Sequence, residues 1–289
     1  MTDISIVIPT RNRPVLLGRC LASLCEQTMD AASFDICVAD NGAPEQTQKV
    51  IALVTAHYPK HRIGMIAETA RGVSAARNAG ARQTSSPLIA QLDDDMIVAP
   101  DWLARLTAGF AQDDKIGKIG GPVAPIFAAP RPAWMTDDML PLLVGGNGAG
   151  NACYRRGALA AAGYFPVSLG HKGNNLLAGE NAVDRVMEAA GWKNLADNAI
   201  VAQHTIAAER VTPAWARRRA FWQGIAEHAT EVYLHGKGIE TGAAMENPLP
   251  LDRDDWLFIN NADQPPTADA LVRLRGLGRT LARSGFMPI

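Results

Sequence analysis

The sequence predicts an α/β protein with one mostly parallel, Rossmann-like sheet flanked by helices. Three observations lead to this prediction. Strand-like and helix-like segments alternate over about the first 120 residues, the strand-like runs are continuously apolar, and polar side chains collect where those runs end. Continuous apolar runs are typical of strands buried on both faces, and an alternation of strand with helix is typical of parallel sheets.

The N-terminal pattern contains four strands, each followed by a helix. We expect strands at residues 4–10, 34–42, 62–69 and 87–94, and helices at residues 13–28, 44–58, 72–84 and 101–113. The first helix carries Leu16, Cys20 and Leu24 at helical spacing, so it should pack its apolar stripe on the sheet.

The second half of the chain is less regular. It indicates a strand at 116–123, a glycine-rich turn before a short helix at 144–165, a polar loop leading into a helix at 168–192, and a strand at 198–205. Thr212 and Pro213 are typical of a helix start, so a long helix should follow them. Residues 239–266 lack sustained periodicity and are interpreted as a loop or lid before a last helix. We therefore expect a main domain, residues 1–210, and a C-terminal helical extension, residues 211–289.

Composition excludes several classes of protein. The chain has 28 basic and 29 acidic residues and a net charge of -1, so no overall field would recruit nucleic acid. No apolar run approaches the roughly 18 residues of a membrane span, and the first residues do not resemble a signal peptide. The four cysteines form no C-x-x-C pair. We expect a cytoplasmic protein, and leave open a homodimer and a peripheral contact with the inner face of the membrane.

Polar residues follow each of the first four expected strands. They are Thr10, Arg11 and Asn12, then Asp40 and Asn41, then Arg71, and finally Asp93, Asp94 and Asp95. Each could be a turn or cap residue. Ligand sites of parallel sheets lie beyond the carboxyl ends of the strands, however, so the four groups together indicate a site.

The run of three carboxylates indicates a cation. If the chain is still extended there, Asp93 and Asp95 face the same side. Carboxylates held together repel unless a cation intervenes, and hard oxygen ligands suit Mg²⁺ or Mn²⁺ with a substrate phosphate. The alternative is an acidic loop that caps the next helix.

Two further patterns are compatible with a nucleotide. Arg77 and Asn78 are expected at the start of a helix, where phosphate binds well. Asp40 follows a strand directly and could bond a nucleobase or ribose. The alternatives are a surface arginine and a turn-forming aspartate.

Seven stretches, in this order, resemble the motifs of family 2 glycosyltransferases with the GT-A fold. They are "ISIVIPTRNRPVLLGRCLASLCEQT", "CVADNGA", "RGVSAARNAG", "QLDDDMIVAPDWL", "GNACYRRGALAAAGYF", "GENAVDRVMEAAGW" and "VAQHT". The resemblance covers roughly residues 3–235. It implies an inverting enzyme that moves a sugar from a UDP-, GDP- or dTDP-linked donor to an acceptor hydroxyl.

The resemblance also implies roles for individual residues. The donor would be bound by Pro9, Thr10, Arg11, Asp40, Arg71, Arg77, Asn78, Asp93 and Asp94, with Asp40 at the base and Asp93 near the ribose. Asp95 would hold a divalent ion, Mn²⁺ or Mg²⁺, and His204 would complete the metal site. The metal would neutralise the leaving diphosphate. Without the resemblance, a lone histidine after a strand is usually structural.

The expected general base departs from the family pattern. Family members commonly read G-E-D where this chain reads Gly179, Glu180 and Asn181. An amide cannot usefully accept a proton, so the role falls to Glu180 or to Asp184 one turn further on. Glu180 could instead orient the acceptor or cap the helix.

Four residues are predicted to contact the acceptor. Asn151 and Arg155 lie in a segment that lines the acceptor side in the family, and Trp134 and His171 are candidates for sugar stacking and hydrogen bonding. The last two could equally be packing or loop residues. The acceptor class is left open between a glycan, a lipid-linked molecule and a small molecule.

The helix around residues 215–224 mixes aromatic residues with three arginines. It could lie on an anionic membrane, or pack its aromatics inside the protein with the arginines solvated or facing a diphosphate.

Two alternative functions of the protein are left open. One is a nucleotidyltransferase, and the other is a sugar-nucleotide or glycan-binding protein that has lost its base at Asn181.

Overall fold

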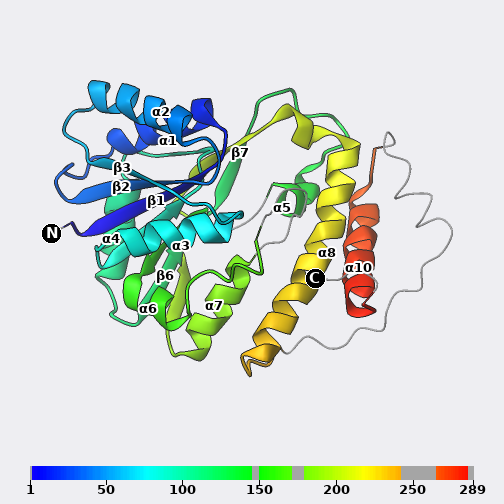
Figure 1. Cartoon of the computed structure of the whole chain (residues 1–289). Helices are drawn as coiled ribbons and strands as arrows, with labels where there is room; N and C mark the ends of the chain where they lie inside the picture. The colour runs from blue at the N-terminus through cyan, green and yellow to red at the C-terminus, as the bar shows by residue number, and fades with distance from the viewer. Residues whose placement is uncertain (1, 145–149, 171–178, 242–264, 286–289) are drawn as a thin grey trace. The chain divides into compact units, whose positions relative to one another are not determined.

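The structure, a computed structural model, describes residues 2–144, 150–170, 179–241 and 265–285 (Figure 1). These residues form two compact units, which are described separately. The sheet unit comprises Met1–Ala124, Asn147–Ser168 and Val183–His204, and the helical unit comprises Pro125–Gly146, Leu169–Ala182 and Thr205–Ile289. Most of the loop or lid that we predicted at 239–266 lies outside the described residues.

The sheet unit is built on seven strands in the order β3-β2-β1-β4-β8-β6-β9. The strands are β1 (Ile4–Thr10), β2 (Phe34–Asp40), β3 (Ile63–Ala67), β4 (Leu88–Leu92), β6 (Ile116–Gly120), β8 (Asn151–Arg155) and β9 (Lys193–Ala196). All neighbouring pairs are parallel except the two that involve β8. The predicted mostly parallel sheet is therefore confirmed.

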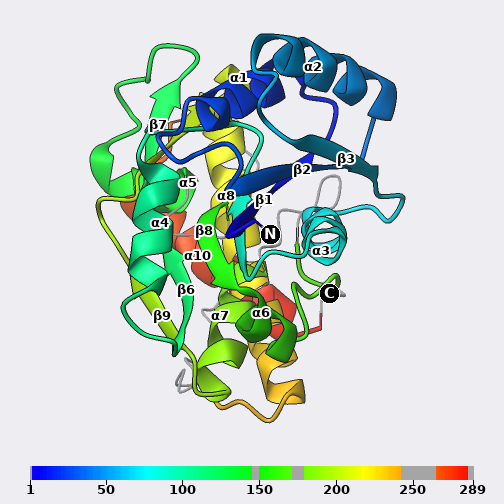
Figure 2. The same cartoon turned by 90° about the vertical axis from the view of Figure 1, so that its left-hand side faces the viewer.

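Helices cover both faces of this sheet (Figure 2). They are α1 (Pro14–Cys25), α2 (Pro44–His57), α3 (Val73–Gln83), α4 (Trp102–Phe110), α6 (Arg156–Ala161) and α7 (Glu180–Ala189). Ile6 and Ile8 pack with α1 and α4, whereas Val7 and Ile89 pack with α3, α6 and the later part of α7. Neighbouring strand residues thus enter opposite cores, because successive side chains point to opposite faces.

Strand β8 was missed in the sequence, where we expected only a glycine-rich turn before a short helix. It pairs antiparallel with β4, so that Asn151 lies opposite Leu92 and Arg155 opposite Leu88. The run is short and contains an alanine and a cysteine rather than β-branched residues, which leaves it without a local strand pattern. Asn151 and Arg155 therefore lie at opposite ends of this strand, Asn151 beside the carboxyl end of β4 and Arg155 beside its start.

The fourth strand ends earlier than predicted. β4 stops at Leu92, and the carbonyl of Asp93 accepts a hydrogen bond of 3.1 Å from the amide of Met96. The three aspartates therefore lie in a tight turn, and the expected extended chain at Asp93 and Asp95 was wrong. The chain then continues as β5 (Met96–Val98), which belongs to a second sheet of order β5-β10-β7 with β10 (Ala202–Ile206) and β7 (Val123–Phe127).

The helical unit contains the longest helix, α8 (Pro213–Gly236), and α10 (Ala268–Arg283), which pack together (Figure 1). Short helical turns, η1 (Asp137–Met139), α5 (Leu140–Leu143) and η2 (Ala208–Val211), complete the part that is described. The hydroxyl of Thr212 accepts a hydrogen bond of 3.3 Å from the Trp215 amide, which confirms the predicted start of α8. None of the described helices has the length and apolar composition needed to cross a membrane.

Two glycines allow α8 and α10 to approach closely. A Cβ atom on Gly224 would lie 1.8 Å from the carbonyl oxygen of Arg275, and one on Gly278 would lie 2.1 Å from that of Phe221. We expect Gly224→Ala to lower the free energy of unfolding by about 1–3 kcal/mol, because the backbones must separate. Thermal denaturation would measure this loss.

Gly236 supplies the matched control for that substitution. It also lies in α8, but a Cβ atom there would meet no atom within 4 Å. Gly236→Ala should therefore leave the melting temperature unchanged or raise it, since alanine is the better helix former by about 1 kcal/mol. Equal losses of stability in both variants would contradict the close packing at Gly224.

Candidate active site

The carboxyl ends of β1, β2 and β4 bring together polar residues that are far apart in the sequence. Thr10, the last residue of β1, is in register with Asp40, the last residue of β2. Across β1, the hydroxyl of Thr10 donates a hydrogen bond of 2.7 Å to Oδ2 of Asp94, just beyond β4. These residues therefore gather at one edge of the sheet, as the sequence predicts.

Arg13 holds two of the three aspartates. Its Nη1 donates to Oδ1 of Asp94 at 3.2 Å and to Oδ2 of Asp95 at 2.9 Å. Burial raises the pKa of the Asp94 carboxyl to about 6, although the positive charge of Arg13 opposes this increase. Arg13 was not among the predicted site residues; its position three residues after the end of β1 was the signal that could have found it.

His204 reaches the same carboxylate oxygen from another strand. Its Nε2 lies 3.3 Å from Oδ2 of Asp95, and both side chains are buried. The contact follows from strand pairing, because β10 runs antiparallel to β5 and places His204 opposite Met96. The structure thus brings together the two residues that the family resemblance assigns to a metal.

The residues at this position fit a divalent ion only as a partial ligand set. Asp95 and His204 supply an oxygen and a nitrogen, and Mg²⁺ or Mn²⁺ at such sites takes its other ligands from water and substrate phosphates. In the part of the chain that the structure describes, no group of three or more His, Cys, Asp or Glu side chains could hold a metal ion by itself. Further ligands would therefore have to come from the substrate or solvent.

Asp93 points to a different partner. Its Oδ1 accepts a hydrogen bond of 2.8 Å from Nη2 of Arg77, a residue in the middle of α3 whose side chain is almost fully buried. A Cβ atom on Gly150 would lie 2.3 Å from Oδ2 of Asp93, so a larger residue there would displace this carboxylate. We expected Arg77 near the helix N-terminus, but α3 begins four residues earlier, at Val73.

Asn78 is occupied by the protein backbone. Its side-chain amide donates to the carbonyl of Phe165 at 2.7 Å and accepts from the amide of the same residue at 2.9 Å. Both polar ends of the side chain are thereby used. These two bonds fix the segment around Phe165 against α3.

Asp40 is held by the loop that follows it and by helix α2. One oxygen accepts from the amide of Gly42 at 2.6 Å, and the other accepts from the hydroxyl of Thr47. Its neighbour Asn41, whose role the sequence did not specify, donates to the carbonyls of Glu68 and Ala70 at 2.7 and 2.6 Å. This amide ties the loop after β2 to the segment that precedes Arg71.

The remaining predicted donor residues lie at the same edge. Pro9 is buried within β1, whereas Arg11 and Arg71 are exposed on the loops that follow β1 and β3. An exposed arginine can approach an anionic ligand without breaking a contact that holds the fold together. The structure therefore leaves both guanidinium groups accessible.

The two candidates for the general base have different surroundings. Asp184 accepts a hydrogen bond of 2.6 Å from Nζ of Lys118, which is itself buried. Glu180 is the first residue of α7 and is partly exposed, while Asn181 beside it is exposed. The ion pair with Lys118 gives Asp184 a structural task.

Two of the predicted acceptor residues are structural. Asn151 is fully buried; its oxygen accepts from the indole of Trp102 at 2.9 Å, and its amide donates to two carbonyls. Arg155 donates to the carbonyl of Ile116 at 3.0 Å and lies opposite Leu88, at the edge where β4 begins. Both residues thus make structural contacts, because β8 runs antiparallel and buries Asn151 while carrying Arg155 to the other end of the sheet.

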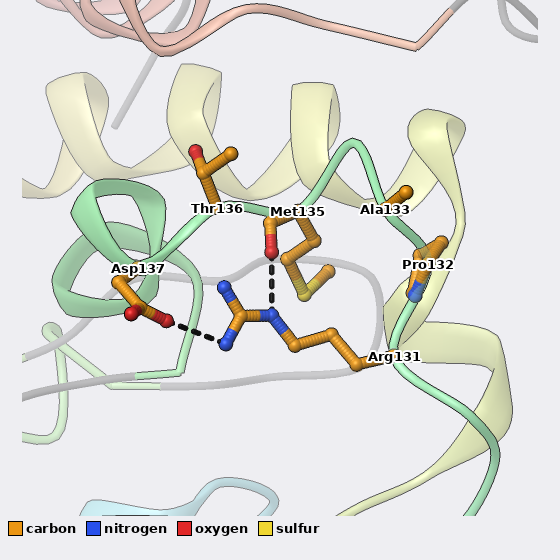
Figure 3. Close-up of a pocket in the computed structure, with 6 residues that line it drawn as sticks. All are labelled: Arg131, Pro132, Ala133, Met135, Thr136 and Asp137. Atoms are coloured by element: carbon orange, nitrogen blue, oxygen red, sulfur yellow. Dashed lines mark hydrogen bonds and ion pairs between the residues drawn. The ribbon is translucent and has the colours of Figure 1, made fainter.

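The structure gives little support to an acceptor role for the other two candidates, Trp134 and His171. Trp134 packs partly buried against the apolar cluster of the helical unit, which favours the packing interpretation. It stands within a segment that surrounds an open pocket of about 400 Å³ (Figure 3), whose lining residues are Arg131, Pro132, Ala133, Met135, Thr136 and Asp137. His171 lies outside the described residues.

Comparison with known proteins identifies the class to which this site belongs. The profile described as glycosyl transferase family 2 matches residues 5–159, more than half of the 289 residues. The chain belongs to this family. The expectation drawn from the sequence motifs is therefore confirmed at the level of the family.

Two relatives are similar to part of the chain. The validoxylamine A glucosyltransferase of Streptomyces hygroscopicus subsp. jinggangensis is 36% identical over 110 residues, which are 37% of this chain and 25% of that protein. The glucosyl-dolichyl phosphate glucuronosyltransferase of Haloferax volcanii is 24% identical over 178 residues, 56% of each chain. The matches thus span about a quarter to a half of these relatives.

Solved structures show that the fold extends over nearly the whole chain. One is the mannosyltransferase PcManGT of Pyrobaculum calidifontis in complex with GDP-Man and Mn²⁺, with a TM-score of 0.61 at 17% identity; the match covers 99% of this chain and 76% of PcManGT. Another is S. aureus TarS 1-349 in complex with UDP-GlcNAc, with a TM-score of 0.58 at 15% identity; the match covers 99% of this chain and 91% of TarS 1-349. The protein has the GT-A fold.

Proposed function

We propose that the protein is an inverting glycosyltransferase that moves a sugar from a nucleoside diphosphate sugar to an acceptor hydroxyl with the help of Mn²⁺ or Mg²⁺. The observation that carries the proposal is the shared contact of Asp95 Oδ2 with His204, at the sheet edge where ligands of such folds bind. Membership of glycosyl transferase family 2 supports the reaction class.

The donor nucleotide would be held by side chains from four strand ends. Asp40 is oriented by Gly42 and Thr47 and would accept hydrogen bonds from the base or ribose. Asp93, oriented by Arg77, would meet the ribose. The exposed guanidinium groups of Arg11 and Arg71 would bind phosphate oxygens, which their planar fork matches.

The metal would be held by Asp95 and His204. When bound, it would neutralise the negative charge that develops on the leaving nucleoside diphosphate. Glu180 would remove the proton from the acceptor hydroxyl, and direct attack from the opposite side of the anomeric carbon would invert its configuration. Residues 1–210 would thus contain the donor site, and residues 211–289 would form a helical extension.

Two structural relatives hold nucleotide sugars: PcManGT is in complex with GDP-Man and TarS with UDP-GlcNAc. We propose a UDP-, GDP- or dTDP-linked sugar as donor, and a glycan, a lipid-linked molecule or a small molecule as acceptor. The test is to incubate the protein with Mn²⁺ and a panel of these donors and to measure nucleoside diphosphate release with and without acceptors.

The same assay separates an enzyme from a binding protein. Turnover of a donor that depends on an acceptor is the expected result. Donor binding without turnover across the panel would instead favour a non-catalytic sugar-nucleotide or glycan-binding protein, for which Asn181 in place of the usual aspartate is the supporting feature.

Arg13 should limit metal binding in the absence of a nucleotide. Its Nη1 already contacts Oδ2 of Asp95, the oxygen that would ligate the metal. We expect Arg13→Ala to bind Mn²⁺ about tenfold more tightly without nucleotide, since a hydrogen bond between charged groups contributes roughly 1.5–3 kcal/mol. Calorimetric titration with Mn²⁺ alone measures the change.

Arg19→Ala is the control for Arg13→Ala, because Arg19 is an exposed arginine on the neighbouring helix α1. It should bind Mn²⁺ like the unmodified protein. If Arg13→Ala bound Mn²⁺ no better than Arg19→Ala, Arg13 would not compete for the metal position.

A further inference from the structure

Arg13 contacts the acidic turn through only one of its three side-chain nitrogens. Its Nη1 lies 3.2 Å from Oδ1 of Asp94 and 2.9 Å from Oδ2 of Asp95. The other two nitrogens, Nε and Nη2, make no hydrogen bond with any residue that the structure describes, and 51% of the side chain is exposed. A guanidinium carries five N–H donors in a rigid fork, so most of those on Arg13 remain available to a second anion.

The backbone of Arg13 is fixed although its side chain is exposed. Asn12, the preceding residue, has a φ of 55°, in the left-handed region that asparagine adopts more readily than most residues. The carbonyl of Arg13 accepts a hydrogen bond of 3.0 Å from the amide of Leu17 in α1. The guanidinium can therefore change its partner by rotation of the side chain alone.

The contact of Arg13 with Asp94 can persist when its contact with Asp95 is lost. Asp94 is also held by Thr10, whose hydroxyl donates to Oδ2 at 2.7 Å, so its position does not depend on Arg13 alone. Oδ2 of Asp95, in contrast, is the oxygen that lies 3.3 Å from His204. A divalent ion on that oxygen would repel the guanidinium, because both are positively charged.

We propose that Arg13 binds the diphosphate of the donor when a divalent ion is bound to Asp95, and that it thereby couples the binding of the two ligands. This inference rests on the proposed function, which assigns the ion and the donor to this edge of the sheet. Without the ion, Arg13 neutralises Asp95. In the complex, its guanidinium leaves Oδ2 of Asp95 and donates paired N–H groups to phosphate oxygens. Each ligand then strengthens the binding of the other, because coupling between two sites is reciprocal.

Calorimetric titrations of Mn²⁺ and of UDP, GDP or dTDP, each alone and each with the other at saturation, measure this coupling. Arg13→Ala should bind Mn²⁺ alone about tenfold more tightly and the nucleotide in saturating Mn²⁺ about tenfold more weakly. The reason is that one charged hydrogen bond is lost from the metal-free protein and another from the nucleotide complex. The nucleotide alone, and Mn²⁺ in saturating nucleotide, should bind as they do to the unmodified protein. The factor by which either ligand strengthens the other therefore falls about tenfold.

Two neighbouring arginines provide matched controls. Arg11→Ala changes an exposed residue that makes no contact with the three aspartates of the turn in the described part of the chain, so it should weaken nucleotide binding equally with and without Mn²⁺. Arg19→Ala, on the exposed side of α1, should change none of the four affinities. The melting temperature of Arg13→Ala should stay close to that of the unmodified protein, since Thr10 still holds Asp94.

The outcomes separate this role of Arg13 from the proposed function. If Arg13→Ala bound Mn²⁺ more tightly by the same factor with and without nucleotide, Arg13 would only compete with the ion and the inference would be refuted. It would also be refuted if none of the three nucleotides bound in the presence of Mn²⁺. If the coupling fell in Arg13→Ala but no donor sugar were transferred by the unmodified protein, the proposed reaction would be refuted and the role of Arg13 would stand.

Discussion

Glu180→Gln is expected to lower kcat by about 10²–10⁴-fold, the usual contribution of a general base. Glutamine has nearly the same shape as glutamate but cannot accept the proton of the acceptor hydroxyl. Glu180 stands at the start of α7 and is partly exposed, so the substitution should not disturb the core. Steady-state kinetics with a saturating donor, together with the affinity for the donor, would show a loss confined to kcat.

Two other carboxylates on α7 serve as controls for this result. Glu188→Gln changes an exposed residue of the same helix and should leave kcat unchanged. Asp184→Asn removes the partner of the buried Lys118, so it should lower the free energy of unfolding by roughly 3–5 kcal/mol. If Glu180→Gln kept its kcat while a correctly folded Asp184→Asn lost it, the base would be Asp184.

Asp95→Ala should remove metal-dependent turnover, with a fall in kcat on the order of 10²–10³-fold, as for the loss of one element of electrostatic stabilisation. The reason is that Oδ2 of Asp95 is the oxygen shared by His204 and Arg13. The fold should persist, because Arg13 keeps its contact with Asp94. Binding of Mn²⁺ in the presence of UDP or GDP should weaken in parallel.

Asp101 provides the matched control for the metal site. It lies six residues further on and forms an exposed ion pair with Arg105. Asp101→Ala should therefore retain both turnover and Mn²⁺ binding, since exposed pairs contribute little to stability. Full metal-dependent turnover in Asp95→Ala would exclude Asp95 as a ligand.

Local pattern was sufficient for much of the sheet unit and for the first helix of the C-terminal extension. The apolar run at Ile4–Thr10 and the cap at Thr212 form the structures that they predict. Periodicity and capping depend on residues within a few positions of each other, so a single sequence expresses them fully. The gathering of polar residues at the strand ends was also predictable from the sequence, because parallel strands place their carboxyl ends at one edge of the sheet.

What the sequence by itself determined is therefore the α/β architecture, the edge at which the site lies and, through the family motifs, the pairing of Asp95 with His204. Only the tertiary structure revealed the antiparallel β8, which buries Asn151 and places Arg155 opposite Leu88, where β4 begins. It also revealed the ion pair of Arg13 with Asp95 in the acidic turn and the ion pair of Lys118 with Asp184. These contacts join residues 66 to 82 positions apart, and nothing in the local pattern of either partner specifies the other.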